Sequence, residues 1–138
     1  MTDSTPPELT AEELEYIESV FELARAGETA QLARTVEAGV PVNLTNARGD
    51  SLLILAAYHQ RADTVDALIS LGADVDRVND MGQTATSCAV FRNNPDIVLA
   101  LLKAGADPDL GSHTALQIAQ QFELAEMQRL LTSARQGD

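Results

Sequence analysis

Apolar and polar residues alternate along the chain with the period of amphipathic helices. In residues 10–26 one face of such a helix collects apolar side chains, at Leu14, Ile17, Val20, Phe21 and Ala24. Shorter runs of the same kind cover residues 31–38, 64–71 and 97–104. Thr10 and Glu13 have the spacing of a capping box, so we expect the first helix to begin there. The pattern predicts a chain made mainly of helices.

Each of the three shorter runs ends in a segment that recurs at a fixed spacing. Residues 72–76 (GADVD) and 105–109 (GADPD) lie 33 positions apart, and a weaker copy at 39–43 (GVPVN) lies another 33 positions upstream. The same step relates three further pairs: Gly49 and Gly82, Ser51 and Thr84, and Ala56 and Ala89. A period of this length indicates a stacked array of repeated units.

The residue types that recur are those that begin and end helices. Three glycines directly follow helical runs, as residues that end a helix with positive φ do: Gly39, Gly72 and Gly105. Ser51 and Thr84 stand where a hydroxyl would cap the next helix, and Pro95 follows a capping Asn. Residues 46–49 and 79–82 begin with Asn and end with Gly, which predicts tight turns at the tips of extended fingers.

This pattern of residues that recur every 33 positions resembles the ankyrin repeat, in which a finger-like turn is followed by two antiparallel helices over about 33 residues. The residues that carry the resemblance are 49–57, 64–69 and 72–76, then 82–89, 96–102 and 105–109. The resemblance implies an all-α, ankyrin-repeat α-solenoid of about four stacked helix-turn-helix repeats with finger-like β-turns. We expect a flexible N-terminal tail at residues 1–9 and a single domain at 10–134, with repeats at approximately 10–45, 46–78, 79–109 and 110–134. Ala119 follows Ala89 by 30 residues, so the last finger should be three residues short.

The chain departs from the family at the start of each first helix. The segment Thr-Pro-Leu-His that is typical of the family is replaced by SLLI at 51–54, TATS at 84–87 and TALQ at 114–117. Neither the Pro nor the His is kept, so the hydrogen bond that this His usually makes between repeats is lost. Thr86 stands where a core Leu is expected, and we therefore expect the third repeat to be the least stable.

The length of the chain indicates one domain, and its charge argues against several classes of partner. The chain has 138 residues, the size of one domain, and 21 acidic residues against nine basic ones give a net charge of −12. This charge argues against binding to nucleic acid or to an anionic membrane. The N-terminus lacks the features of a signal peptide, and no apolar run approaches the length of a membrane span. We expect a cytoplasmic protein, in the simplest case a monomer.

The candidate catalytic residues do not form a convincing site. Cys88 could pair with His59 or His113 as nucleophile and base, but its place on an inner helix predicts a small buried apolar side chain. Two histidines without the right helical spacing do not make a zinc site. Residues 74–85 resemble a calcium loop only superficially, because Val78 and Ala85 replace ligands. We expect no enzyme, no cofactor and no metal.

The family resemblance implies a module that binds another protein. Ankyrin arrays typically use the finger tips and the first helix of each repeat, which together line a concave surface. Carried over to this chain, the partner-binding residues are Arg48, Asp50, Tyr58, His59, Arg77, Met81, Gln83, Phe91 and Arg92. Tyr58 and Phe91 are two of only five aromatic residues and lie 33 positions apart, so we expect an exposed row of anchors.

Two other functions remain open at this point. Residues 1–22 contain seven acidic residues and no basic one, so the chain could be an acidic inhibitor or nucleic-acid mimic that captures a basic partner. It could also be a regulatory subunit or a small enzyme that uses His59, Cys88 or its carboxylates. Binding that weakens steeply with salt would favour the acidic surface, and turnover or metal binding would favour the enzyme.

Overall fold

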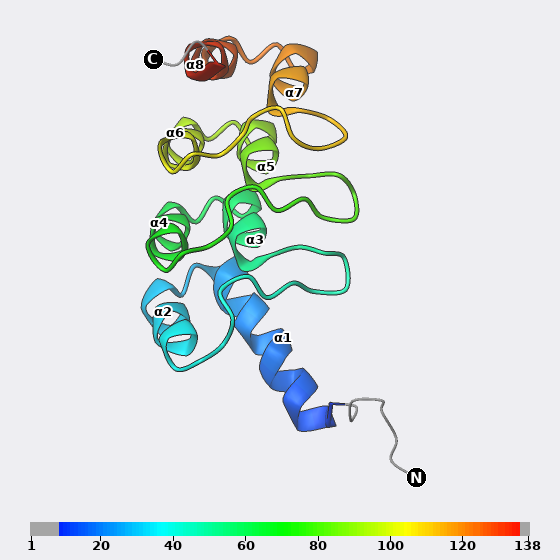
Figure 1. Ribbon diagram of the computed structural model, residues 1–138, viewed down its shortest axis with the longest axis vertical. Helices are drawn as coiled ribbons and strands as arrows, with labels where there is room; N and C mark the ends of the chain where they lie inside the picture. The colour runs from blue at the N-terminus through cyan, green and yellow to red at the C-terminus, as the bar shows by residue number, and fades with distance from the viewer. Residues whose placement is uncertain (1–8, 136–138) are drawn as a thin grey trace.

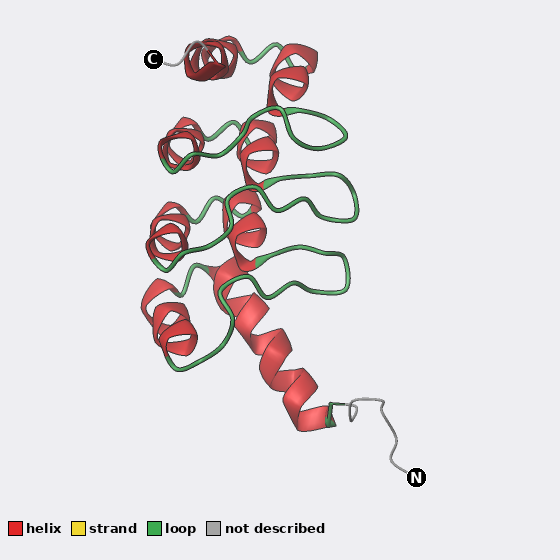
Figure 2. Ribbon diagram, viewed as in Figure 1, coloured by secondary structure: helices red, strands yellow, loops and turns green. Residues whose placement is uncertain are grey.

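A computed structural model describes residues 9–135 of the chain, and within them it contains helices and loops but no named strand (Figures 1 and 2). The helices are α1 (Ala11–Ala26), α2 (Thr29–Glu37), α3 (Leu52–Tyr58), α4 (Ala62–Ser70), α5 (Ala85–Phe91), α6 (Pro95–Lys103), α7 (Ala115–Gln121) and α8 (Ala125–Arg135). Apart from Leu9, the tail expected at residues 1–9 lies outside the described residues. The all-α prediction is confirmed.

The helices form two rows of a stacked array. Consecutive helices pair through a short turn, with α1, α3, α5 and α7 in an inner row and α2, α4, α6 and α8 in an outer row (Figure 1). Each helix contacts the next one in its row as well as its own pair-mate. The array is therefore a solenoid of four helix pairs, in which each layer is held by its neighbours.

The predicted helix starts are confirmed in their hydrogen bonds. Thr10 and Glu13 form a reciprocal capping box, and the Thr10 N–H that donates to Glu13 holds the pKa of this carboxyl below its ordinary value. The side chains of Ser51 and Thr84 each accept a bond from the backbone N–H three residues on. Pro95 occupies the first turn of α6 behind its Asn cap.

The turns within the helix pairs repeat one backbone conformation. Gln60, Asn93 and Glu123, the residues that follow α3, α5 and α7 at equivalent places, all have φ between 55° and 60°. Gly27 has φ 78° at the corresponding place after α1. A left-handed residue at this place reverses the chain in every layer, so the four pairs share one geometry.

Three loops project from the same side of the array as fingers (Figure 1). They cover residues 38–51, 71–84 and 104–114, so the third is three residues shorter, as predicted. Backbone hydrogen bonds join successive fingers, from Asp80 N to Arg48 O (3.0 Å) and from Ser112 N to Gly82 O (2.9 Å). The fingers therefore form one continuous surface beside the inner helices.

The core lies between the two rows and is built from small and branched apolar side chains. The first six residues of both α3 and α5 are buried, including the close-packed Ala56, Ala57 and Ala89. Thr86 is 1% exposed, and its hydroxyl has no hydrogen-bond partner in the described part of the chain. A polar group therefore occupies a core position of the third layer, as the sequence suggested.

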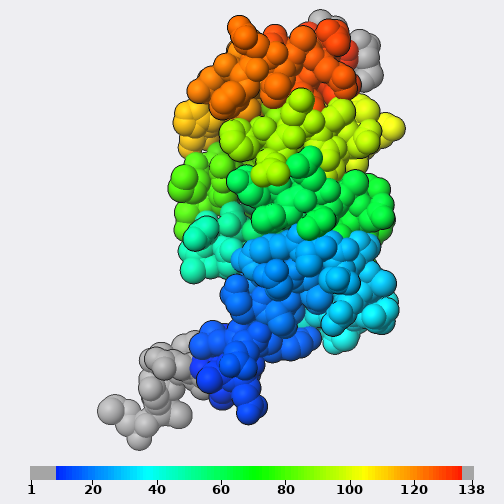
Figure 3. Space-filling model, turned by 180° about the vertical axis from the view of Figure 1, so that it is seen from behind, coloured from blue at the N-terminus to red at the C-terminus, as the bar shows by residue number. Residues whose placement is uncertain are grey.

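The first half of α1 extends beyond the body of the array (Figure 3). Its buried residues are confined to the second half, at Val20, Phe21 and Ala24. Leu14 belongs to the predicted apolar face of the helix but is 54% exposed. The apolar pattern of α1 continues beyond the point where a neighbouring helix is available, so the side chains there have nothing to pack against.

Candidate protein-binding site

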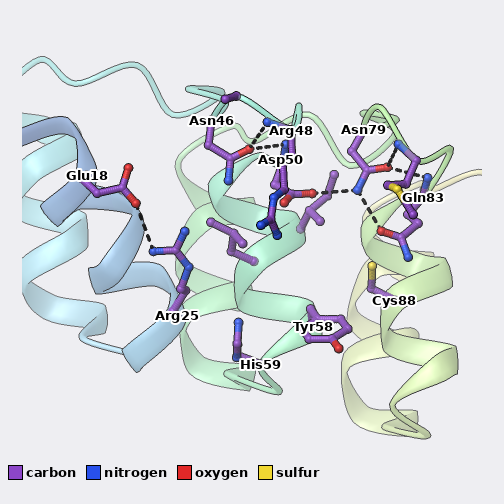
Figure 4. Close-up of a pocket in the computed structure, with 14 residues that line it drawn as sticks. Glu18, Arg25, Asn46, Arg48, Asp50, Tyr58, His59, Asn79, Gln83 and Cys88 are labelled. Carbon is purple, nitrogen blue, oxygen red and sulfur yellow. Dashed lines mark hydrogen bonds and ion pairs between the residues drawn. The ribbon is translucent and has the colours of Figure 1, made fainter. Parts of the chain in front are cut away.

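A hollow of about 620 Å³ lies between the fingers and the inner helices (Figure 4). The first two fingers form one wall, and α1, α3 and α5 form the other. Its lining residues are Glu18, Arg25, Asn46, Ala47, Arg48, Asp50, Ile54, Leu55, Tyr58, His59, Asn79, Met81, Gln83 and Cys88. The hollow thus spans three layers of the array and opens on the side where fingers and inner helices face each other.

Six of the nine residues proposed from the sequence line this hollow: Arg48, Asp50, Tyr58, His59, Met81 and Gln83. Phe91 and Arg92 lie outside its lining, at the end of α5, in the places equivalent to Tyr58 and His59. Arg77 also lies outside it, at the base of the second finger, where its guanidinium donates to Asn43 O (3.4 Å). The hollow and the row of residues beyond it form one candidate surface.

Two asparagines that the sequence analysis did not assign to the site fix the shape of the fingers. Asn46 Oδ1 accepts hydrogen bonds from the backbone N–H groups of Arg48 and Asp50 (2.9 and 3.0 Å). Asn79 Oδ1 accepts in the same way from Met81 and Gln83 (3.0 and 2.8 Å). Their signal was the Asn at the start of each turn, since an Asn side chain commonly bonds the backbone two residues on.

Asn79 also ties the two fingers to each other. Its Nδ2 donates to Asp50 Oδ1 (2.7 Å) and to Gln83 Oε1 (2.9 Å), and the residue is only 6% exposed (Figure 4). Asp50 and Gln83 are therefore held in place by a buried amide before any partner arrives. Such preorganisation reduces the entropy that binding must overcome.

The ends of the inner helices form a row of exposed rings and guanidinium groups. Tyr58, Phe91 and Phe122 are 37%, 50% and 51% exposed, which confirms the predicted exposure of the first two. The guanidinium of Arg92 lies over the Tyr58 ring, 5.1 Å from its centroid. The Phe91 and Phe122 rings meet edge to face at 5.6 Å. In each contact, the last residue of one inner helix meets the residue that directly follows the next inner helix. The row therefore runs diagonally across the layers.

Three arginines lie near His59 at one end of the row. Arg61 Nε donates to the Arg25 carbonyl (2.8 Å) and so lies across the end of α1, where a cation is favourable. Burial first, and then the charges of Arg25, Arg61 and Arg92, hold the pKa of His59 below its ordinary value. Glu22 acts in the opposite direction but less strongly. The neutral form of His59 is therefore favoured.

The residues considered for catalysis do not have the properties of a reactive pair. Cys88 is 3% exposed, and burial, with a smaller effect of Asp50, raises the pKa of its thiol to about 12. The thiol is therefore protonated at neutral pH and is a poor nucleophile. Between residues 9 and 135 no group of three or more His, Cys, Asp or Glu side chains could hold a metal ion. Over the same range no helix has the length and apolarity needed to cross a membrane.

The fold and this surface define a helical repeat protein whose fingers and inner helices face a common hollow. The family model for ankyrin repeats, which spans three copies, matches residues 15–112, and the chain belongs to the ankyrin repeat family. A protein of Pseudomonas aeruginosa that is named as an ankyrin repeat protein is 51% identical over 65 residues. The match covers 47% of this chain, but only 38% of that protein's length.

Proposed function

We propose that the chain is a non-enzymatic adaptor or regulatory binder that holds one partner protein against the hollow and the adjoining row. Ankyrin repeats are generally protein-binding modules, and membership in this family supports the proposal. The observation that carries the proposal is that the fingers and inner helices bring Arg48, Tyr58, His59 and Met81 to one hollow. Because fold alone does not define function, the residues of this surface are the subject of the test.

The chemistry of the surface fits a protein partner. Met81 is 72% exposed at the tip of the second finger, and Tyr58 and Phe91 are exposed at the opposite side of the surface. Aromatic and Arg side chains dominate the energetics of protein interfaces, and flexible Met side chains adapt to a partner's shape. The first two fingers, which form one wall of this surface, are held in shape by the hydrogen bonds of Asn46 and Asn79.

The partner can be identified by purifying the native protein under mild conditions and determining the mass of what accompanies it. Amide chemical shifts of the labelled chain, recorded with and without that purified partner, then locate the contact. We expect the largest changes in residues 46–50, 79–83 and at the ends of α3 and α5. Changes confined to the outer row, α2, α4, α6 and α8, would contradict the proposal.

One observation favours a second candidate function, capture of a basic protein by the acidic first helix. Glu12, Glu13, Glu15, Glu18 and Glu22 are all exposed on α1. Tyr16, beside them, is 54% exposed on the half of the helix that projects from the array. A complex held by this surface should dissociate steeply as salt rises, whereas one anchored by Tyr58 and Phe91 should depend on salt much less.

We place the protein in the cytoplasm, where the free thiol of Cys88 would stay reduced, and cell fractionation tests this location. We also propose a monomer, because a net charge of −12 opposes self-association, and sedimentation measures the mass directly. The partner is expected to be a protein and not a nucleic acid, which a gel-shift assay with DNA and RNA would check.

A further inference from the structure

The strongly negative charge of the chain is distributed unevenly over its surfaces. Helix α1 has five glutamates and a single basic residue, Arg25. The outer helices carry five acidic residues and four basic ones, so they are nearly neutral. The inner helices α3, α5 and α7 contain no charged residue. The charged residues beside the row of exposed rings include Arg25 on α1 and three residues that come just after the inner helices, Arg61, Arg92 and Glu123.

Three of those charges are guanidinium groups, and each of them makes a different contact. Arg25 is paired within α1, with Glu22 at 3.1 Å and Glu18 at 3.6 Å. Arg61 is held by its bond to the Arg25 carbonyl, and Arg92 lies over the Tyr58 ring. In the described part of the chain neither Arg61 nor Arg92 has an ion pair. Two fixed cations thus remain uncompensated in a protein that has more than twice as many acids as bases.

The effect on His59 agrees with this placement. Burial is the largest cause that lowers the pKa of His59, and the three guanidinium groups lower it further, against a smaller opposite effect of Glu22. Several cations therefore lie close to His59, although the chain as a whole is negative.

We propose that Arg61 and Arg92 receive carboxylates of the partner, so that the row binds an acidic segment whose apolar side chains lie on Tyr58, Phe91 and Phe122. This inference rests on the proposed function and names the chemistry of the partner. Guanidinium groups bind carboxylates through paired hydrogen bonds, and both are already oriented by a carbonyl or a ring. The overall charge repels long polyanions, so the segment carries a few carboxylates between apolar residues.

A selection from a library of short random peptides displayed on phage, with the full chain as target, tests this chemistry. Selected peptides should be enriched in Asp and Glu and contain aromatic or aliphatic residues. Their dissociation constants, measured by fluorescence anisotropy, should rise with ionic strength because the contact is partly electrostatic. Amide shifts of the labelled chain locate each peptide on the array.

A pair of variants with equal charge change isolates the two arginines. The double variant R61Q/R92Q should bind the selected acidic peptides roughly tenfold more weakly, because two exposed ion pairs are lost. The control R34Q/R129Q removes two exposed cations from the outer helices α2 and α8 and should leave the affinity within about twofold. Thermal melting of both variants checks that the fold is kept.

Different results would contradict binding of an acidic segment and binding of any protein at this surface. Neutral or basic peptides that bind at the row, or equal weakening in both double variants, would overturn the acidic-segment inference alone. Peptides that bind only the outer helices, or a selection that enriches no sequence, would overturn both. Acidic peptides at the row that need Arg61 and Arg92 would support both.

Discussion

Two threonines near the start of α5 have the same side chain and opposite surroundings. Thr84 Oγ1 accepts a hydrogen bond from Ser87 N (3.0 Å) and so caps the helix. Thr86 is buried to the same degree, but its hydroxyl has no partner in the described structure. A capped helix end stabilises the fold, whereas an unsatisfied buried hydroxyl costs free energy.

The same substitution should therefore have opposite effects at these two positions. Thr86→Val removes the unsatisfied hydroxyl at nearly constant shape and should raise the free energy of unfolding by about 1 kcal/mol. Thr84→Val removes the cap and should lower it by about 1 kcal/mol. Urea unfolding of both variants measures the difference. A destabilised Thr86→Val protein would show that the hydroxyl has a partner after all.

At the residue scale, His59 gives the chain a pH dependence with a definite sign. Its pKa is lowered in the folded state, so as pH falls through the ordinary value of 6.5 the unfolded chain takes up a proton first. The folded state then loses stability until its own lower pKa is reached, and the full contribution of His59 is present above pH 6.5.

Replacement of His59 by Gln should reduce the loss of stability between about pH 7.5 and pH 5.5. The measurement is the free energy of unfolding in urea at the two pH values. His113→Gln is the matched control, since it removes the other histidine and retains the His59 contribution. If His59→Gln loses as much stability on acidification as the parent, burial and the neighbouring arginines do not lower the pKa of His59.

At the scale of the element, the helix ends and fingers show what local sequence can determine. Thr10, Ser51 and Asn94 were recognised as caps because capping needs only a side chain and a backbone group a few residues away. The helix period placed Leu14 on the apolar face but did not predict its exposure, which depends on where the array ends. The tie between Asn79 and Asp50 was also missed, since it joins two fingers.

Two glycines with positive φ separate backbone strain from contact between fingers. A Cβ at Gly72 (φ 92°) would have no atom within 4 Å, whereas one at Gly82 (φ 79°) would overlap the Ser112 side chain of the next finger. Gly72→Ala should therefore cost about 1 kcal/mol from strain alone. Gly82→Ala should cost clearly more, because the third finger must also move. Unfolding free energies of both variants test this, and equal losses would mean that the fingers do not abut.

At the scale of the whole molecule, the repeat period was the most informative feature of the sequence. It located four helix pairs and placed Tyr58 and Phe91 in equivalent positions, because stacked repeats convert a period into a row. The arginine contacts at one end of that row were not predictable. Arg61 reaches across to α1, and Arg92 across to Tyr58, so each depends on the rotation between neighbouring repeats.

We propose that the partner is held at the surface formed by the fingers and the inner helices. The most direct measurement is the affinity of the purified partner for the double variant Y58A/F91A, beside a matched double variant, Y16A/L99A. Tyr16 and Leu99 are also exposed but lie on α1 and the outer helix α6, outside the hollow. Both variants should melt close to the parent.

Y58A/F91A should raise the dissociation constant roughly a hundredfold or more, because two aromatic anchors are lost at once. Y16A/L99A should leave it nearly unchanged. A drop in melting temperature of Y58A/F91A alone would reassign its two rings to the core. Unchanged affinity of Y58A/F91A together with weakened binding by Y16A/L99A would contradict binding at this surface, and would place the partner on the acidic first helix or the outer row.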